Sequence, residues 1–128
     1  MSLDHIGLGV GDIERARAFY GAALAPLGLT LVMEVPPELT GGLAALGFGK
    51  ERPFFWISGG GATKPRLHVA FTADSREAVN DFYAAAMAAG AEDNGAPGLR
   101  PHYHPNYYGA FVLDPDGHNI EAVCHRPA

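Results

Sequence analysis

The stretch HIGLGVGDIERARAFYGAAL, residues 5–24, decides the fold, because a related stretch, HVAFTADSREAVNDFYAAAM, occurs again at residues 68–87. The two stretches lie 63 residues apart and have six identical positions out of twenty. This spacing is close to half of the 128-residue chain. We therefore expect two tandem copies of one supersecondary unit.

Each copy begins with a predicted strand in which apolar and other residues alternate. In residues 3–10 and 67–72, the histidines His5 and His68 fall on the face opposite the apolar side chains. Apolar residues at helical spacing then predict a helix in each copy, with Asp12 and Asp74 as the N-cap residues. Further strands are expected at residues 29–35, 42–48 and 53–58 of the first copy and at 91–95, 109–113 and 119–125 of the second.

This pattern predicts an α+β fold of two tandem βαβββ units. The units span about residues 3–60 and 65–126 of a single domain, 1–128, and a glycine-rich segment at 58–65 joins them. We expect their curved mixed sheets to pair and enclose a cup, with the helices outside.

The composition indicates a folded protein with a small-molecule partner. Hydrophobic residues make up 48% of the chain, which excludes intrinsic disorder, and no stretch is long and apolar enough for a membrane helix. A net charge of −5 without a basic run argues against nucleic acid and anionic membranes as partners. The single cysteine, Cys124, cannot form a disulfide within the chain, so we expect a cytoplasmic protein.

Three side chains are of the types that commonly bind a divalent metal ion. Glu121 lies in the last predicted strand among apolar neighbours, where a carboxylate is costly to bury unless it is paired or bound to a cation. Together with His5 and His68 it forms a set of two imidazoles and one carboxylate, which suits one divalent Fe, Mn, Ni, Co or Zn ion. Each residue could instead be structural, with Glu121 paired to Arg66 or Arg126.

The irregular segment 98–108 is rich in histidine and tyrosine and is the best candidate for substrate recognition. Imidazoles and phenols can transfer protons or donate hydrogen bonds to an oxyanion. Alternatively, the segment only covers one end of the sheet, or His102 and His104 form a second metal site. His118 is expected at the surface or in a turn. The candidate catalytic residues are His104, Tyr103 and Tyr108, and the candidate substrate-binding residues are Trp56, Arg100, His102 and Tyr107.

The duplicated unit, the start Asp4-His5-Ile6-Gly7-Leu8-Gly9-Val10 and the ending Asp114-Pro115-Asp116-Gly117-His118-Asn119-Ile120-Glu121 resemble the vicinal oxygen chelate superfamily. That superfamily includes glyoxalase I, fosfomycin-resistance enzymes, extradiol dioxygenases and bleomycin-resistance proteins. The resemblance implies metal ligands at His5, near Trp56 or Ser58, at His68 and at Glu121. Glyoxalase I needs a glutamate at the second of these positions. The three-ligand pattern is therefore closer to fosfomycin-resistance enzymes and extradiol dioxygenases.

The resemblance implies a homodimeric, divalent-metal-dependent enzyme that acts on a small substrate chelated through vicinal oxygens. Lyase, isomerase or transferase chemistry is the first expectation. One alternative is an Fe(II) extradiol-type dioxygenase. The other is a metal-free protein that sequesters a small molecule, as bleomycin-resistance proteins do.

Overall fold

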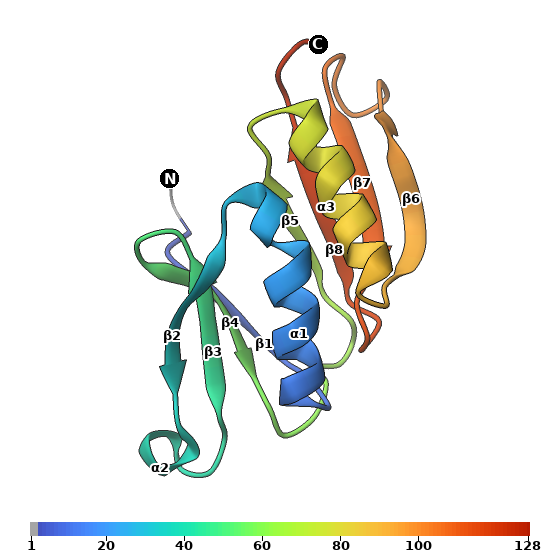
Figure 1. The fold of residues 1–128 in the computed structure, drawn as a ribbon. Coiled ribbons are helices and arrows are strands. Elements are labelled where there is room, and N and C mark those ends of the chain that lie inside the picture. The colour runs from blue at the N-terminus through green and yellow to red at the C-terminus, as the bar shows by residue number, and fades with distance from the viewer. Residues whose placement is uncertain (1–2) are drawn as a thin grey trace.

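The computed structural model describes residues 3–128 and has two βαβββ units, as predicted (Figure 1). The first unit contains β1 (Ile6–Gly9), α1 (Ile13–Ala23), the 3-10 turn η1 (Ala25–Leu27), β2 (Thr30–Val35), α2 (Pro37–Thr40), β3 (Ala45–Gly49) and β4 (Pro53–Ser58). The second contains β5 (His68–Thr72), α3 (Arg76–Ala88), β6 (Glu92–Leu99), β7 (Tyr108–Leu113) and β8 (Asn119–Cys124).

The two units have the same sheet topology. The strand order is β1-β4-β3-β2 in the first sheet and β5-β8-β7-β6 in the second. In each unit the first and last strands pair in parallel, and the other pairs are antiparallel. Figure 1 shows α1 and α3 side by side on the same side of the two sheets, which leaves the opposite sheet faces uncovered by helices.

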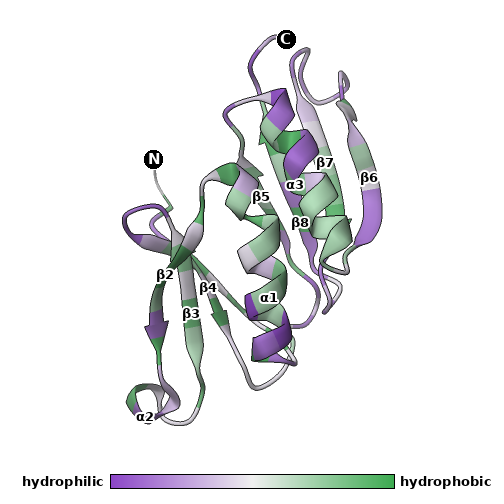
Figure 2. Cartoon of the chain, viewed as in Figure 1, coloured by the Kyte–Doolittle hydropathy of each residue, from purple (hydrophilic) through white to green (hydrophobic). Residues whose placement is uncertain are grey.

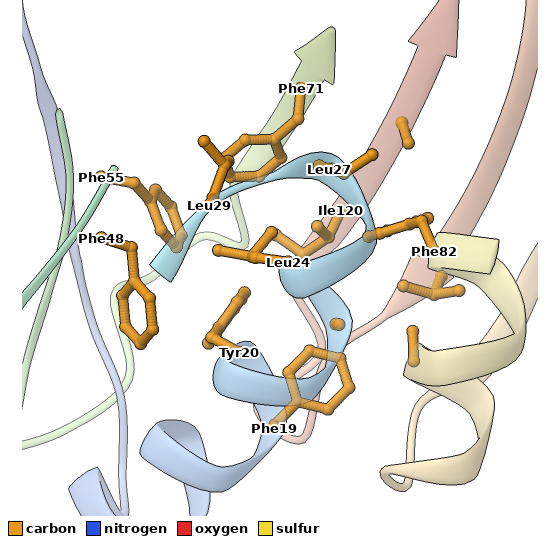
Figure 3. Packing of buried hydrophobic residues seen from close by; sticks show 14 of the residues in the cluster. Phe19, Tyr20, Leu24, Leu27, Leu29, Phe48, Phe55, Phe71, Phe82 and Ile120 are labelled. Atoms are coloured by element: carbon orange, nitrogen blue, oxygen red, sulfur yellow. The ribbon is translucent and has the colours of Figure 1, made fainter. Parts of the chain in front are cut away.

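One hydrophobic core joins the two units. The Tyr20 ring of α1 packs 5.2 Å from the ring of Phe55, which in turn lies 5.1 Å from Phe71 of the second unit. In Figure 3, Leu24, which directly follows α1, lies between the side chains of the first sheet and Phe82 of α3. The core is therefore continuous across the boundary between the units.

Polar residues mark the parts of the fold that lie outside this core. Figure 2 shows hydrophilic residues at the N-terminal turns of α1 and α3 and in the first part of β6. Among residues 3–128, no helix is long and apolar enough to cross a membrane.

Of the two predicted N-cap residues, one is confirmed and one needs correction. Asp12 caps α1 as expected, since its carboxylate accepts from the Glu14 and Arg15 amides. The N-cap of α3 is Ser75 rather than Asp74, because the Ser75 hydroxyl accepts from the amide of Ala78.

Strand β6 is also longer than the predicted strand at 91–95. Irregularities in its register with β7 lie between Asp93 and Gly95 and between Gly95 and Gly98. Gly95 has a φ of +146°, a conformation that suits glycine, and pairing then continues to Leu99. The irregular connection is therefore residues 100–107.

Candidate functional site

His68 and Glu121 form the centre of the candidate site, on the sheet face opposite α3. Strands β5 and β8 are adjacent and parallel, with Ala70 opposite Glu121. The Nε2 atom of His68 lies 2.7 Å from Oε1 of Glu121. The Glu121 side chain is only 1% exposed, whereas that of His68 is 53% exposed. The two ligands predicted from the second unit therefore lie together, with the imidazole open to solvent.

Tyr107 contacts the other oxygen of the same carboxylate. Its hydroxyl donates a hydrogen bond to Oε2 of Glu121. Burial raises the pKa of the Tyr107 phenol, and the hydrogen bond and charge of Glu121 raise it further, whereas the charge of Arg100 opposes the rise. Both oxygens of Glu121 thus have polar partners, and neither partner is an arginine.

Gly109 provides the space for this contact. A Cβ atom added at Gly109 would lie 3.1 Å from Cε1 of Tyr107 and 3.4 Å from Oε2 of Glu121. A side chain at this position would push against both groups, so glycine allows the phenol to reach the carboxylate.

His5 lies apart from this pair. Its side chain is 61% exposed, and its Nδ1 lies 2.6 Å from Oδ1 of Asp4, a contact that lowers the Asp4 pKa. His5 lines a cavity of about 560 Å³ together with Phe54 and with Thr72 of β5. Within residues 3–128, no three His, Cys, Asp or Glu side chains are grouped so as to hold a metal ion. One chain therefore does not bring the predicted triad together.

The sheet register identifies Trp56 as the counterpart of Glu121. Gly7 of β1 and Ala70 of β5 correspond at the 63-residue spacing of the repeat. Trp56 lies opposite Gly7, just as Glu121 lies opposite Ala70. A uniform 63-residue offset would instead select Ser58. The first unit thus has an indole where the second has its buried carboxylate.

The Trp56 ring lies across a glycine on the neighbouring strand. A Cβ atom added at Gly47 would come within 2.9 Å of the indole, so only glycine leaves room for the ring there. Trp56 also lines a cavity of about 400 Å³ with Gly7, Ser58 and Thr63. This position offers an apolar wall and no metal-ligating oxygen.

Arg100 lies on the same sheet face as Glu121. Its guanidinium carbon is 5.4 Å from the centre of the Phe111 ring. It donates hydrogen bonds of 2.8 Å to the carbonyls of Gly98 and Ala96. Since Phe111 lies opposite Glu121 in the register of β7 and β8, the guanidinium is fixed close to the His68–Glu121 pair.

The segment 100–107 forms an aromatic cluster that reaches Glu121 through Tyr107. The Tyr103 ring lies 4.1 Å from His102 and 5.0 Å from Tyr107. His125 lies 5.2 Å from Tyr107 and 5.6 Å from His104. The structure thus brings four candidate residues of this segment together near the pair.

Tyr108 is the exception among the candidate residues. Its hydroxyl donates a 2.7 Å hydrogen bond to Oδ1 of Asn80 in α3, and Arg76 lies over its ring at 5.1 Å. Successive residues of a strand point to opposite faces, so Tyr108 faces α3 while Gly109 faces Glu121. The structure therefore places Tyr108 away from the candidate site.

His118 is completely buried, and its expected place at the surface is wrong. Its Nδ1 accepts a 3.0 Å hydrogen bond from the Leu67 amide, and its Nε2 lies 3.3 Å from the carbonyl of Gly9. Strand alternation carries the missing signal, because residue 118 shares a face with Ile120. His118 therefore connects Gly9 of β1 with Leu67, the residue that precedes β5.

Comparisons with solved structures agree with this architecture. A glyoxalase/bleomycin resistance protein from Albidiferax ferrireducens T118 is 25% identical, with a TM-score of 0.76 over 97% of this chain and 99% of that one. The fosfomycin resistance protein FosX from Listeria monocytogenes, in complex with Mn(II) and sulfate, is 21% identical, with a TM-score of 0.68 over 97% and 93%. A glyoxalase I mutant from Zea mays is 22% identical, with a TM-score of 0.69 over 98% of this chain and 45% of that one.

No curated protein has significant sequence similarity to the chain. The family model described as Glyoxalase/Bleomycin resistance protein/Dioxygenase superfamily matches residues 2–122, nearly the whole sequence. With its two βαβββ units, the chain belongs to this superfamily.

Proposed function

We propose that the protein is a divalent-metal-dependent enzyme in which His68 and Glu121 are metal ligands. The observation that carries this proposal is the 2.7 Å approach of an imidazole nitrogen to a buried carboxylate oxygen. Burial of Glu121 without a cationic arginine or lysine is expensive, and a bound cation would offset that cost. Imidazole and carboxylate together suit Fe, Mn, Ni, Co or Zn.

We further propose that His5 of a second copy completes the ligand set in a homodimer. His5 and Trp56 lie on the open face of the first sheet, and His68 and Glu121 lie on the open face of the second. A two-fold arrangement that faces the first sheet of each copy toward the second sheet of the other would create two identical sites. Each site would have three protein ligands, because Trp56 supplies no oxygen.

A divalent cation held by His68 and Glu121 would supply Lewis acidity toward a small oxygen-bearing substrate, which favours lyase, isomerase or transferase chemistry. The Tyr107 hydroxyl fixes the orientation of Glu121 through its hydrogen bond. His104 and Tyr103 are the candidates for handling protons. Arg100, His102 and Trp56 are the candidates for contacting the substrate.

A second candidate function is metal-free binding of a small molecule. It is favoured by the hydrogen bonds of Glu121, whose two oxygens are satisfied by His68 and Tyr107 without a cation. In that case the histidine and glutamate would be structural, and ligand affinity would not respond to chelators.

Elemental analysis of protein purified without a metal-affinity column or chelator separates the two functions. We expect near-stoichiometric metal in the wild type and loss of metal in Glu121→Gln. The matched control is Glu92→Gln, which changes an exposed glutamate of β6. A wild-type protein that also refuses added Mn, Fe, Co, Ni and Zn would contradict the enzyme proposal and favour metal-free binding.

Mixed dimers test the shared site. His5→Ala and Glu121→Gln each remove a ligand, so either variant alone should hold no metal. After the two are unfolded and refolded together, a mixed dimer has one intact site if ligands come from both copies. Random pairing should then restore roughly a quarter of the wild-type metal content. If all ligands came from one chain, mixing would restore none.

A further inference from the structure

We propose that Arg100 forms an oxyanion-binding site, so that the substrate carries a carboxylate or phosphonate-type group in addition to its chelating oxygens. This inference rests on the proposed function, because it places the anionic group beside the His68–Glu121 pair. It goes further in naming the chemical class of the substrate.

The Arg100 side chain is held in one orientation. Two of its N–H groups donate to the carbonyls of Gly98 and Ala96 at 2.8 Å, and the guanidinium lies over the Phe111 ring. A Cβ atom added at Gly95 would lie only 3.1 Å from Nη2, so this glycine leaves space for the guanidinium. An arginine fixed in this way has already lost the rotamer freedom that binding would otherwise remove.

The charge of Arg100 lacks a carboxylate partner within the described part of the chain. Arg15, Arg17 and Arg52 each have a carboxylate oxygen within 4.0 Å, whereas Arg100, like Arg66, Arg76 and Arg126, has none in residues 3–128. A guanidinium has five N–H groups, so three remain after the two carbonyl bonds. A half-buried cation with free donors is a natural partner for an oxyanion.

Phe111 links this cation to the proposed metal ligands. Its ring centre lies 6.1 Å from the centre of the His68 imidazole and 5.4 Å from the Arg100 guanidinium carbon. A small molecule held by its vicinal oxygens near His68 can therefore reach Arg100 with an acidic group a few bonds away. The planar fork of arginine matches carboxylate and phosphonate oxygens, which a lysine would contact at one point only.

Titration of the full-length, metal-free protein by NMR tests this site. The probes are methylphosphonate, acetate and the neutral acetamide, and the signal is the Nε–Hε resonance of Arg100, identified by its absence in Arg100→Gln. Affinities in every variant are followed from the backbone amides of Gly95 and Gly98. The matched control is Arg126→Gln, which removes an exposed arginine near the C-terminus.

We expect saturable shifts with at least one anion and none with acetamide. Arg100→Gln should weaken anion binding ~10-fold or more, while Arg126→Gln should leave it unchanged. Tighter binding of methylphosphonate would assign a phosphonate or phosphate group, and tighter binding of acetate would assign a carboxylate. Absence of saturable shifts, or equal affinity in Arg100→Gln, would overturn the site.

The outcome is independent of the metal. A protein that binds metal but no anion at Arg100 keeps the proposed function and loses this inference. If the protein binds an anion at Arg100 but binds none of the metals, the oxyanion site stands and the proposal of metal-dependent catalysis is rejected.

Discussion

Trp56 and Glu121 occupy equivalent positions in the two units. Each lies on the strand that comes last in its unit, and the residues opposite them on the first strands, Gly7 and Ala70, correspond in the repeat. The duplicated scaffold therefore presents two different surfaces. The second unit offers a buried carboxylate paired with His68, and the first offers an indole that lies over Gly47.

A carboxylate at position 56 should tighten metal binding if the two half-sites face each other across a dimer. We expect Trp56→Glu to raise affinity for Mn(II) by about tenfold or more, on the scale of the ~10–100-fold effects of groups that support metal sites. Trp56→Gln is the control for loss of the indole, and calorimetric titration with Mn(II) gives both affinities. Equal affinities in the two variants would show that position 56 lies away from the metal.

Loss of the Tyr107 hydroxyl should weaken metal binding without preventing folding. Tyr107→Phe removes the hydrogen bond to Oε2 of Glu121 and leaves the carboxylate held only at Oε1, by His68. We expect metal affinity to fall by ~10–100-fold. Tyr103→Phe is the matched control. Tyr103 is 61% exposed, and its ring packs against Tyr107 rather than against Glu121. The prediction fails if both variants bind metal as the wild type does.

Replacement of His118 should destabilise the whole fold. His118→Ala leaves the Leu67 amide without its acceptor and opens a cavity beside Gly9. The expected loss in the free energy of unfolding is ~2–4 kcal/mol. Urea denaturation measures it, with His102→Ala as the control at an exposed imidazole. A loss below about 1 kcal/mol would contradict the role of His118 as a connection between the units.

Alkaline pH should destabilise the protein through Tyr20. Burial, followed by the charge of and hydrogen bond to Asp114, raises the pKa of Tyr20 well above its usual value. The folded state then keeps this proton when the unfolded chain, with a tyrosine pKa of about 10, has lost it. The stabilisation is complete below about pH 10 and declines as pH rises toward the folded pKa, by at most ~1.4 kcal/mol per pH unit.

Comparison with Tyr20→Phe isolates this contribution. The variant lacks the ionisable group, so its stability should fall less steeply than that of the wild type between about pH 9.5 and 11. At neutral pH it should be less stable by ~1–3 kcal/mol, because Asp114 loses a buried donor. Parallel stability profiles for the two proteins would refute the assignment.

The repeat was enough to predict the βαβββ architecture, since strand alternation and helical spacing recur in both halves. The His68–Glu121 pair also followed, because both residues lie on one face of strands that become neighbours. The separation of His5 could not be predicted, since the relative orientation of the two sheets depends on side-chain packing such as that of Phe55 on Phe71. Alternation places His118 on the face opposite Glu121, together with Ile120, and the expectation of exposure fails because this face is buried.

The hydrogen bond between Tyr20 of the first unit and Asp114 of the second has a consequence for how this duplicated protein unfolds. The Asp114 carboxylate also accepts hydrogen bonds from the backbone amides of Asp116 and His118. The turn that precedes β8 is therefore organised around a carboxylate that Tyr20 of α1 also contacts. Melting of either half would remove a partner of this buried hydrogen bond and expose the core that the two units share. Despite its internal repeat, the molecule should lose structure in a single cooperative transition, and a fragment containing either half alone should not be stable.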